Sequence, residues 1–167
     1  MRNLEIKARY SNHEQLERQL KKYGARLVSG ERQVDTYFSV PRGRLKLREI
    51  RGGKAELIYY QRGERSTRRW SDYYLYHCAQ PKELKDFLKK IYPVRVIVDK
   101  RRTLYRYRNA KIHVDRVKGL GNFMEIEVQQ ARAGTQTAKL MGTLLQYLRI
   151  PASDFIRHSY SDLLLRK

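Results

Sequence analysis

The chain has 167 residues, with 37 Lys and Arg against 17 Asp and Glu, which gives a formal net charge of +20 at pH 7. Hydrophobic residues make up 41% of the sequence, which excludes an intrinsically disordered chain and predicts a single domain over residues 1–167. No apolar run reaches the roughly 20 residues of a membrane span or resembles a secretory signal, so we expect a cytoplasmic protein with no membrane contact.

Residues 3–10 alternate polar and apolar side chains with period two, which predicts a strand. Ser11 and Glu14 form a capping-box pattern, and Leu16, Leu20 and Tyr23 follow at helical spacing, so we expect a helix that ends before Gly24. The next stretch lacks helical periodicity and predicts strands over residues 34–40, 44–50, 55–62 and 67–78. Because short Gly-containing links separate them, these strands are antiparallel.

The second half of the sequence predicts three more helices and three more strands. Pro81 begins a helix whose apolar side comprises Leu84, Phe87, Leu88 and Ile91. Strands are expected over residues 94–108, 111–117 and 123–129. The last two helices follow from two apolar sets at helical spacing: Met141, Leu144, Leu145 and Leu148, then Ile156, Tyr160, Leu163 and Leu164.

Charged side chains fall on one face of several predicted strands, because residues of equal parity share a face. Examples are Glu5 with Lys7, and Glu125 with Glu127. An ordinary sheet would expose this face to water. About eight antiparallel strands instead tend to curl into closure. We therefore predict an α+β fold, a roughly eight-stranded antiparallel β-barrel with helices packed on the outside and charges pointing inward.

An interior lined with charges of both signs is costly unless it binds something. A chain of phosphates with divalent cations satisfies both signs, since carboxylates hold metals while Arg and Lys hold phosphate oxygens. The net charge of +20 also favours a polyanionic partner, and composition alone leaves nucleic acid as a second candidate.

Several motifs, in chain order, resemble the CYTH superfamily of triphosphate tunnel metalloenzymes, which unites class IV adenylate cyclases and thiamine triphosphatases. The motifs span nearly the whole chain: residues 3–7 (NLEIK), 35–38 (DTYF), 43–48 (GRLKLR), 99–102 (DKRR), 113–115 (HVD), 119–127 (GLGNFMEIE) and 159–164 (SYSDLL). The resemblance implies a triphosphate tunnel and an enzyme that depends on Mg2+ or Mn2+.

The resemblance also implies roles for individual residues. The metal ligands are expected to be Glu5, Asp115, Glu125 and Glu127. The triphosphate is expected to bind Lys7, Arg9, Lys46, Arg48, Arg62, Lys100 and Arg102. Catalysis is assigned to Glu5, Lys7, Glu125 and Glu127. His113 shares a face with Asp115, and the sequence leaves open whether it contacts phosphate.

This sequence departs from the family pattern at two positions. The first Glu of the family's E-x-E-x-K signature is Asn3 here, which implies weaker binding of one metal, because an amide brings no charge. A lysine of the family's L-T-Y-K pattern aligns with Tyr60, and Arg62 on the same strand face is expected to replace it.

Three functions remain open at this point. The first is hydrolysis of tripolyphosphate, thiamine triphosphate or a nucleoside triphosphate. The second is a class IV cyclase that makes cyclic AMP from ATP, which residues 119–127 resemble more closely. The third is a non-catalytic binder of polyphosphate or RNA. The assembly is expected to be a monomer or a homodimer.

Overall fold

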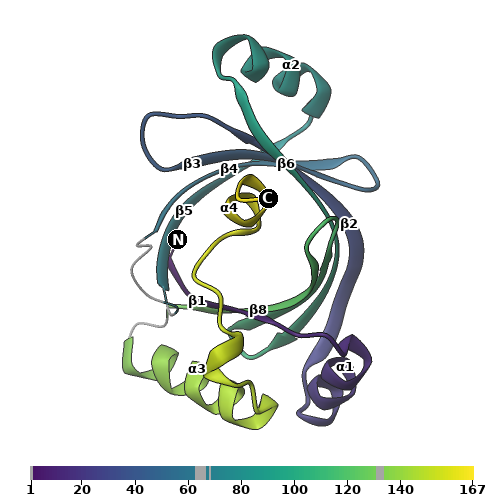
Figure 1. Cartoon of the computed structure of the whole chain (residues 1–167), viewed down its shortest axis with the longest axis vertical. Coiled ribbons are helices and arrows are strands. Elements are labelled where there is room, and N and C mark those ends of the chain that lie inside the picture. The colour runs from purple at the N-terminus through teal and green to yellow at the C-terminus, as the bar shows by residue number, and fades with distance from the viewer. Residues whose placement is uncertain (1, 63–66, 68, 131–133) are drawn as a thin grey trace.

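The computed structural model describes residues 2–62, 67, 69–130 and 134–167 (Figure 1). Within this part of the chain, eight strands close into an antiparallel barrel in the order β1-β5-β4-β3-β2-β6-β7-β8. The strands are β1 (Arg2–Arg9), β2 (Arg26–Phe38), β3 (Arg44–Ile50), β4 (Lys54–Arg62), β5 (Arg69–Cys78), β6 (Val94–Tyr107), β7 (Ala110–Val117) and β8 (Gly121–Gln129). The predicted fold class is confirmed.

The helices are α1 (His13–Lys22), α2 (Pro81–Ile91), α3 (Gly134–Leu148) and α4 (Tyr160–Leu165), with a short 3-10 turn at Ala152–Asp154. Figure 1 shows α1, α2 and α3 around the outside of the ring of strands. None of the described helices is long and apolar enough to cross a membrane.

The helix α4 lies across one end of the barrel, inside the ring in the view of Figure 1. Its side chain Tyr160 packs in a buried cluster with the inward-facing Tyr60, Val98 and Phe123. Asp162 ties the helix to β3, since its two carboxylate oxygens each accept a hydrogen bond of 2.9 Å from the Arg44 guanidinium. The helix therefore closes this end of the barrel.

The apolar faces of the strands pack outward against the helices. The largest core cluster joins Ile6, Ile112 and Ile126 of the strands to Leu16 of α1 and Leu144 of α3. A smaller cluster includes Leu47 and Ala55 with Leu88 of α2. Because apolar residues face outward, the alternate residues of each strand must face the barrel interior.

Three predictions from the sequence are wrong in detail. The second strand begins at Arg26 rather than residue 34, because its first half pairs with the long strand β6 and carries a bulge between Leu27 and Ser29. The cap of α1 is Asn12, not Ser11, and its side chain accepts a hydrogen bond from the Gln15 N–H. Ile156 precedes α4, which Ser159 caps in a capping box with Asp162.

The apolar side of α2 is only partly buried. Leu88 is buried as predicted, but Phe87 and Ile91 remain 59% and 51% exposed. The helix meets the barrel along β3 and β4, so only one edge of its apolar side reaches the sheet.

Candidate active site

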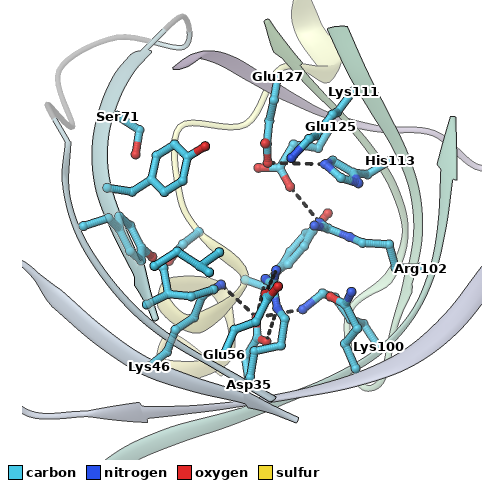
Figure 2. A pocket seen from close by; sticks show the side chains of 18 of the residues that line it. Asp35, Lys46, Glu56, Ser71, Lys100, Arg102, Lys111, His113, Glu125 and Glu127 are labelled. Atoms are coloured by element: carbon cyan, nitrogen blue, oxygen red, sulfur yellow. Dashed lines mark hydrogen bonds and ion pairs between the residues drawn. The ribbon is translucent and has the colours of Figure 1, made fainter. Parts of the chain in front are cut away.

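The barrel encloses a cavity of about 470 Å³ lined by the alternate, inward-facing residues of the strands (Figure 2). Tyr160 of α4 and Ser159, which caps that helix, also line it. Eight of the predicted site residues face this cavity: Glu5, Lys7, Lys46, Arg48, Lys100, Arg102, Glu125 and Glu127. The period-two alternation in the sequence therefore brings distant strands to one site.

One wall of the cavity is a cluster of three cations around one carboxylate, which we call the Asp35 cluster. It consists of Asp35 of β2, Lys46 and Arg48 of β3, and Lys100 of β6. Oδ2 of Asp35 lies 3.0 Å from Nζ of Lys46 and 2.7 Å from Nζ of Lys100, and Oδ1 lies 2.8 Å from Nε of Arg48. The cluster carries more positive than negative charge.

The surplus charge of this cluster shows in its pKa values. Burial lowers the pKa of Lys100 to about 7, and the nearby cations Arg48, Arg102 and Lys46 act in the same direction against the attraction of Asp35. Burial opposes ionisation of Asp35, yet the three cations hold its pKa well below the ordinary value. The carboxylate stays ionised, whereas Lys100 titrates near neutrality and would gain from a bound anion.

A second network crosses the floor of the cavity. The Arg102 guanidinium donates to both oxygens of Asp115 at 2.7 and 2.6 Å, and to Oε2 of Glu125 at 2.8 Å. Nζ of Lys7 lies 2.8 Å from Oε1 of Glu125 and 3.9 Å from the centre of the Tyr160 ring. The Tyr160 hydroxyl donates to Asp115 at 2.8 Å. This network orients Arg102 and Lys7 rigidly.

The opposite wall carries acidic side chains on β1 and β8, and we call Glu5, Glu125 and Glu127 the carboxylate wall. Glu5 and Glu127 are direct cross-strand neighbours in the β1–β8 ladder. Oε1 of Glu127 lies 3.3 Å from Nε2 of His113, and Oε2 accepts a 3.3 Å hydrogen bond from the Asn3 amide. Burial opposes ionisation of Glu127, but His113 helps to lower its pKa to about 2.

A hard divalent cation fits the donors of this wall. Cross-strand neighbours such as Glu5 and Glu127 place their Cβ atoms about 5 Å apart, close enough for both carboxylates to reach one ion. Oδ1 of Asn3 is buried beside them and accepts no hydrogen bond from the described residues. Among those same residues, no group of three or more His, Cys, Asp or Glu is already arranged as a metal site. Glu125 would have to exchange an ion-pair partner to join the set.

The third wall, on β4 and β5, is largely uncharged. Ile58 and Tyr60 of β4 lie opposite Leu75 and Tyr73 of β5 in the ladder, and all four line the cavity. Tyr60, the residue that we aligned with a lysine on the basis of the sequence resemblance, has its ring centre 5.8 Å from Nζ of Lys46. This wall offers aromatic and aliphatic surface beside the cation cluster.

The remaining predicted site residues lie elsewhere or outside the described side chains. Arg9 is exposed near the closed end, where its guanidinium carbon lies 5.3 Å from the centre of the Phe123 ring, and it does not line the cavity. Arg62 belongs to β4 opposite Ser71, but its side chain lies outside the described part of the structure. Asp115 is fully buried behind Arg102, with both oxygens occupied.

Sequence reasoning assigned no role to several residues that shape the site. Asp35 organises three cations, yet its motif showed only a lone acidic residue on a strand. Tyr160 reaches the cavity from the last helix, which periodicity had placed on the outside with its neighbours. Lys111 lines the cavity beside Glu127, its partner in the β7–β8 ladder, and strand parity could have found it.

The family model described as the CYTH domain matches residues 1–160 of the chain. No curated protein matches the sequence. Among solved structures, the chain is similar to the PH1012 protein from Pyrococcus horikoshii OT3, with 25% sequence identity and a TM-score of 0.88, over 96% of this chain and 98% of that chain.

Two further structures share the fold. A Vibrio parahaemolyticus protein that carries the provisional name adenylate cyclase is 20% identical, with a TM-score of 0.80 over 98% of this chain and 97% of that chain. The Hippeastrum protein HpAC1, described as having a dominant triphosphatase activity, is 13% identical, with a TM-score of 0.65 over 98% of this chain and 94% of that chain.

Proposed function

Because this chain belongs to the CYTH domain family, we propose that it is a divalent-metal-dependent enzyme that hydrolyses a triphosphate inside its barrel. The observation that carries the proposal is the meeting of two opposite walls in one cavity. The Asp35 cluster offers surplus positive charge for phosphate oxygens, and the carboxylate wall offers oxygen donors for Mg2+ or Mn2+. A metal-bound triphosphate is the ligand class that uses both.

The cations of the cavity would bind and orient the phosphate chain. Lys46, Arg48 and Lys100 converge within hydrogen-bond distance of Asp35, so their donors already point to one region. Arg102 and Lys7 reach the same cavity from the other side, held by Asp115 and Glu125. Phosphoryl transfer depends mainly on positioning and on neutralising developing charge, which this arrangement supplies.

The carboxylates would hold the metal. We assign this role to Glu5, Glu127 and Glu125, with Asn3 Oδ1 as a neutral donor. A bound divalent cation polarises a phosphoryl oxygen and lowers the pKa of a coordinated water. A direct metal contact for Asp115 stays a prediction, and its bonds to Arg102 and Tyr160 support a positioning role. We also propose the predicted catalytic set. In it, Glu5, Glu125 and Glu127 would hold the metal and Lys7 would bind phosphate.

A class IV cyclase is the second candidate. The uncharged wall of Ile58, Tyr60, Tyr73 and Leu75 favours a triphosphate that carries an organic group over inorganic tripolyphosphate. ATP would satisfy this wall, and attack by its ribose 3′-hydroxyl on the α-phosphate would release pyrophosphate. Thiamine triphosphate would satisfy it equally as a substrate for hydrolysis.

One panel of reactions tests these assignments. The protein is incubated with tripolyphosphate, ATP and thiamine triphosphate, with and without Mn2+ or Mg2+, and phosphate, pyrophosphate and cyclic AMP are followed. Metal-dependent release of phosphate supports the hydrolase, and cyclic AMP with pyrophosphate supports the cyclase. Tight binding without any product would leave the non-catalytic binder. The cytoplasmic location and the monomer or homodimer stay predictions.

A further inference from the structure

A row of four arginines crosses the outer face of the barrel, on the side opposite the cavity lining. Arg32 of β2 lies opposite Arg101 of β6, which lies opposite Arg116 of β7. Arg51 extends the row beyond β3, because its N–H donates to the Arg32 carbonyl at 3.0 Å. Neighbouring strands lie about 4.8 Å apart, so the row spans about 14 Å.

The four side chains are exposed. Like charges directly opposite in a ladder repel each other and destabilise the sheet, so the row is not explained by folding. Asp99 compensates only Arg32, through hydrogen bonds of 2.9 and 2.6 Å. Among the described residues, Arg51, Arg101 and Arg116 form no ion pair. Three guanidinium groups therefore remain available to an external anion.

The helices border the row without covering it. Helix α1 packs against the outer faces of β2 and β7, with His13 close enough to Arg116 to interact electrostatically, but the four arginines stay exposed. In Figure 1, α1 and α2 stand on either side of the outer surface of β2, with no helix between them. Lys118 adds a further cation next to the row, since its N–H donates to the Asp99 carbonyl at 2.9 Å. The surface is convex and positively charged, which suits a long ligand that lies across it rather than a small one that enters a pocket.

We propose that this arginine row binds the sugar–phosphate backbone of a nucleic acid duplex. This binding is independent of the reaction in the cavity. Charge complementarity is the first reason, because a duplex presents regularly spaced phosphates to guanidinium forks. The second reason is the character of the residues that lie beside the row on the same face. Gly30, Val34 and Thr103 provide no aromatic side chain on which unpaired bases could stack.

Binding to a DNA duplex of about 20 base pairs, measured by fluorescence anisotropy over a range of salt concentrations, tests the proposal. The double variant R101Q/R116Q is compared with K89Q/K90Q, which removes the same charge from exposed positions on α2. We expect R101Q/R116Q to weaken binding at least about tenfold and to reduce the slope of log K against log salt by about 2. The control should change affinity by less than about twofold.

The melting temperatures of both variants show whether a loss of affinity comes from a folding defect. R101Q/R116Q should melt at the same temperature as the unaltered protein or higher, because it relieves repulsion between cross-strand neighbours. Equal losses of affinity in the two variants would overturn the proposal in favour of diffuse attraction by the net charge. Tighter binding to a single strand of the same length, or to an acidic protein, would also overturn it.

Discussion

The two charged walls of the cavity differ in how completely their charges are balanced (Figure 2). In the Asp35 cluster, three cations share one carboxylate, and the pKa of the buried Lys100 falls to about 7. On the carboxylate wall, Glu125 and Glu127 each lie against cationic or polar partners, and their pKa values stay below the ordinary range. The cation side is left to be completed by an anion, whereas the acidic side is already ionised and ordered.

Removing the shared carboxylate should have the largest effect. D35N leaves Lys46, Arg48 and Lys100 buried without their common partner, and we expect a loss of about 3–5 kcal/mol in the free energy of unfolding. Urea unfolding measures this loss, and tripolyphosphate should restore part of it. The control is D99N, whose partner Arg32 is 56% exposed, with an expected loss below about 1 kcal/mol. Equal losses in the two variants would contradict the imbalance.

On the other wall, the expected effect is on turnover. E127Q removes charge from the proposed metal site, and metal-dependent release of phosphate should fall about 100-fold. The matched control is E56Q, which lines the same cavity from β4 with similar exposure, 20% against 21% for Glu127. A similar loss of turnover in E56Q would show that any lining carboxylate serves, and the carboxylate wall would have no special role.

Affinity for phosphate distinguishes the cation wall from the general surface charge. K46M should weaken tripolyphosphate binding by about 1.5–3 kcal/mol, because a charge-assisted hydrogen bond in a partly enclosed site is lost. Isothermal titration calorimetry compares it with K89M on the exposed side of α2, where little change is expected. An equally large effect of K89M would indicate attraction by the whole protein.

The pH dependence of binding is the smallest effect and the sharpest test of the imbalance. A bound phosphate favours the charged form of Lys100, so above pH 7 binding takes up a proton and affinity falls by at most about tenfold per pH unit. Calorimetry in two buffers of different ionisation enthalpy measures this uptake at pH 8. K100R should abolish it, since arginine stays charged. Proton uptake that persists in K100R would assign it to another group.

The lowered pKa of Lys100 also makes the free energy of unfolding depend on pH. Between pH 7 and the ordinary value of 10.5, the unfolded chain holds the Lys100 proton more tightly than the folded protein does. The contribution of Lys100 to the free energy of unfolding therefore rises with pH in this window. Below pH 7, where Lys100 is charged, the repulsion between the cations of the Asp35 cluster is strongest.

Strand parity predicted most of the barrel and most of the site. Alternation alone placed Glu5 with Lys7 and Lys46 with Arg48 on one face, and the structure puts all four into the cavity. Parity failed for Arg9, because it identifies the face of a strand but not the end at which the cavity stops. It also left Asp35 without a role, because its three partners come from strands whose register the sequence does not reveal.

The last helix and the arginine row lay beyond sequence reasoning for a related reason. The apolar spacing of Leu163 and Leu164 predicts a helix but not whether it covers the barrel or closes its end. Likewise, Arg32, Arg101 and Arg116 are scattered along the chain and become neighbours only through two antiparallel registers.

The pairing of β1 with β8 also sets the order in which the protein acquires its chemistry. Nζ of Lys7 and Oε1 of Glu125 meet across 118 positions of the chain, at the seam where the barrel closes. During synthesis β1 emerges first and can pair with β5, but its other partner, β8, is the last strand to emerge, and such distant pairings form slowly. In an incompletely folded chain, the carboxylate wall therefore does not yet face the Asp35 cluster. The protein can bind a metal and a triphosphate together only after β1 and β8 have paired. This binding therefore distinguishes the completely folded protein from its folding intermediates.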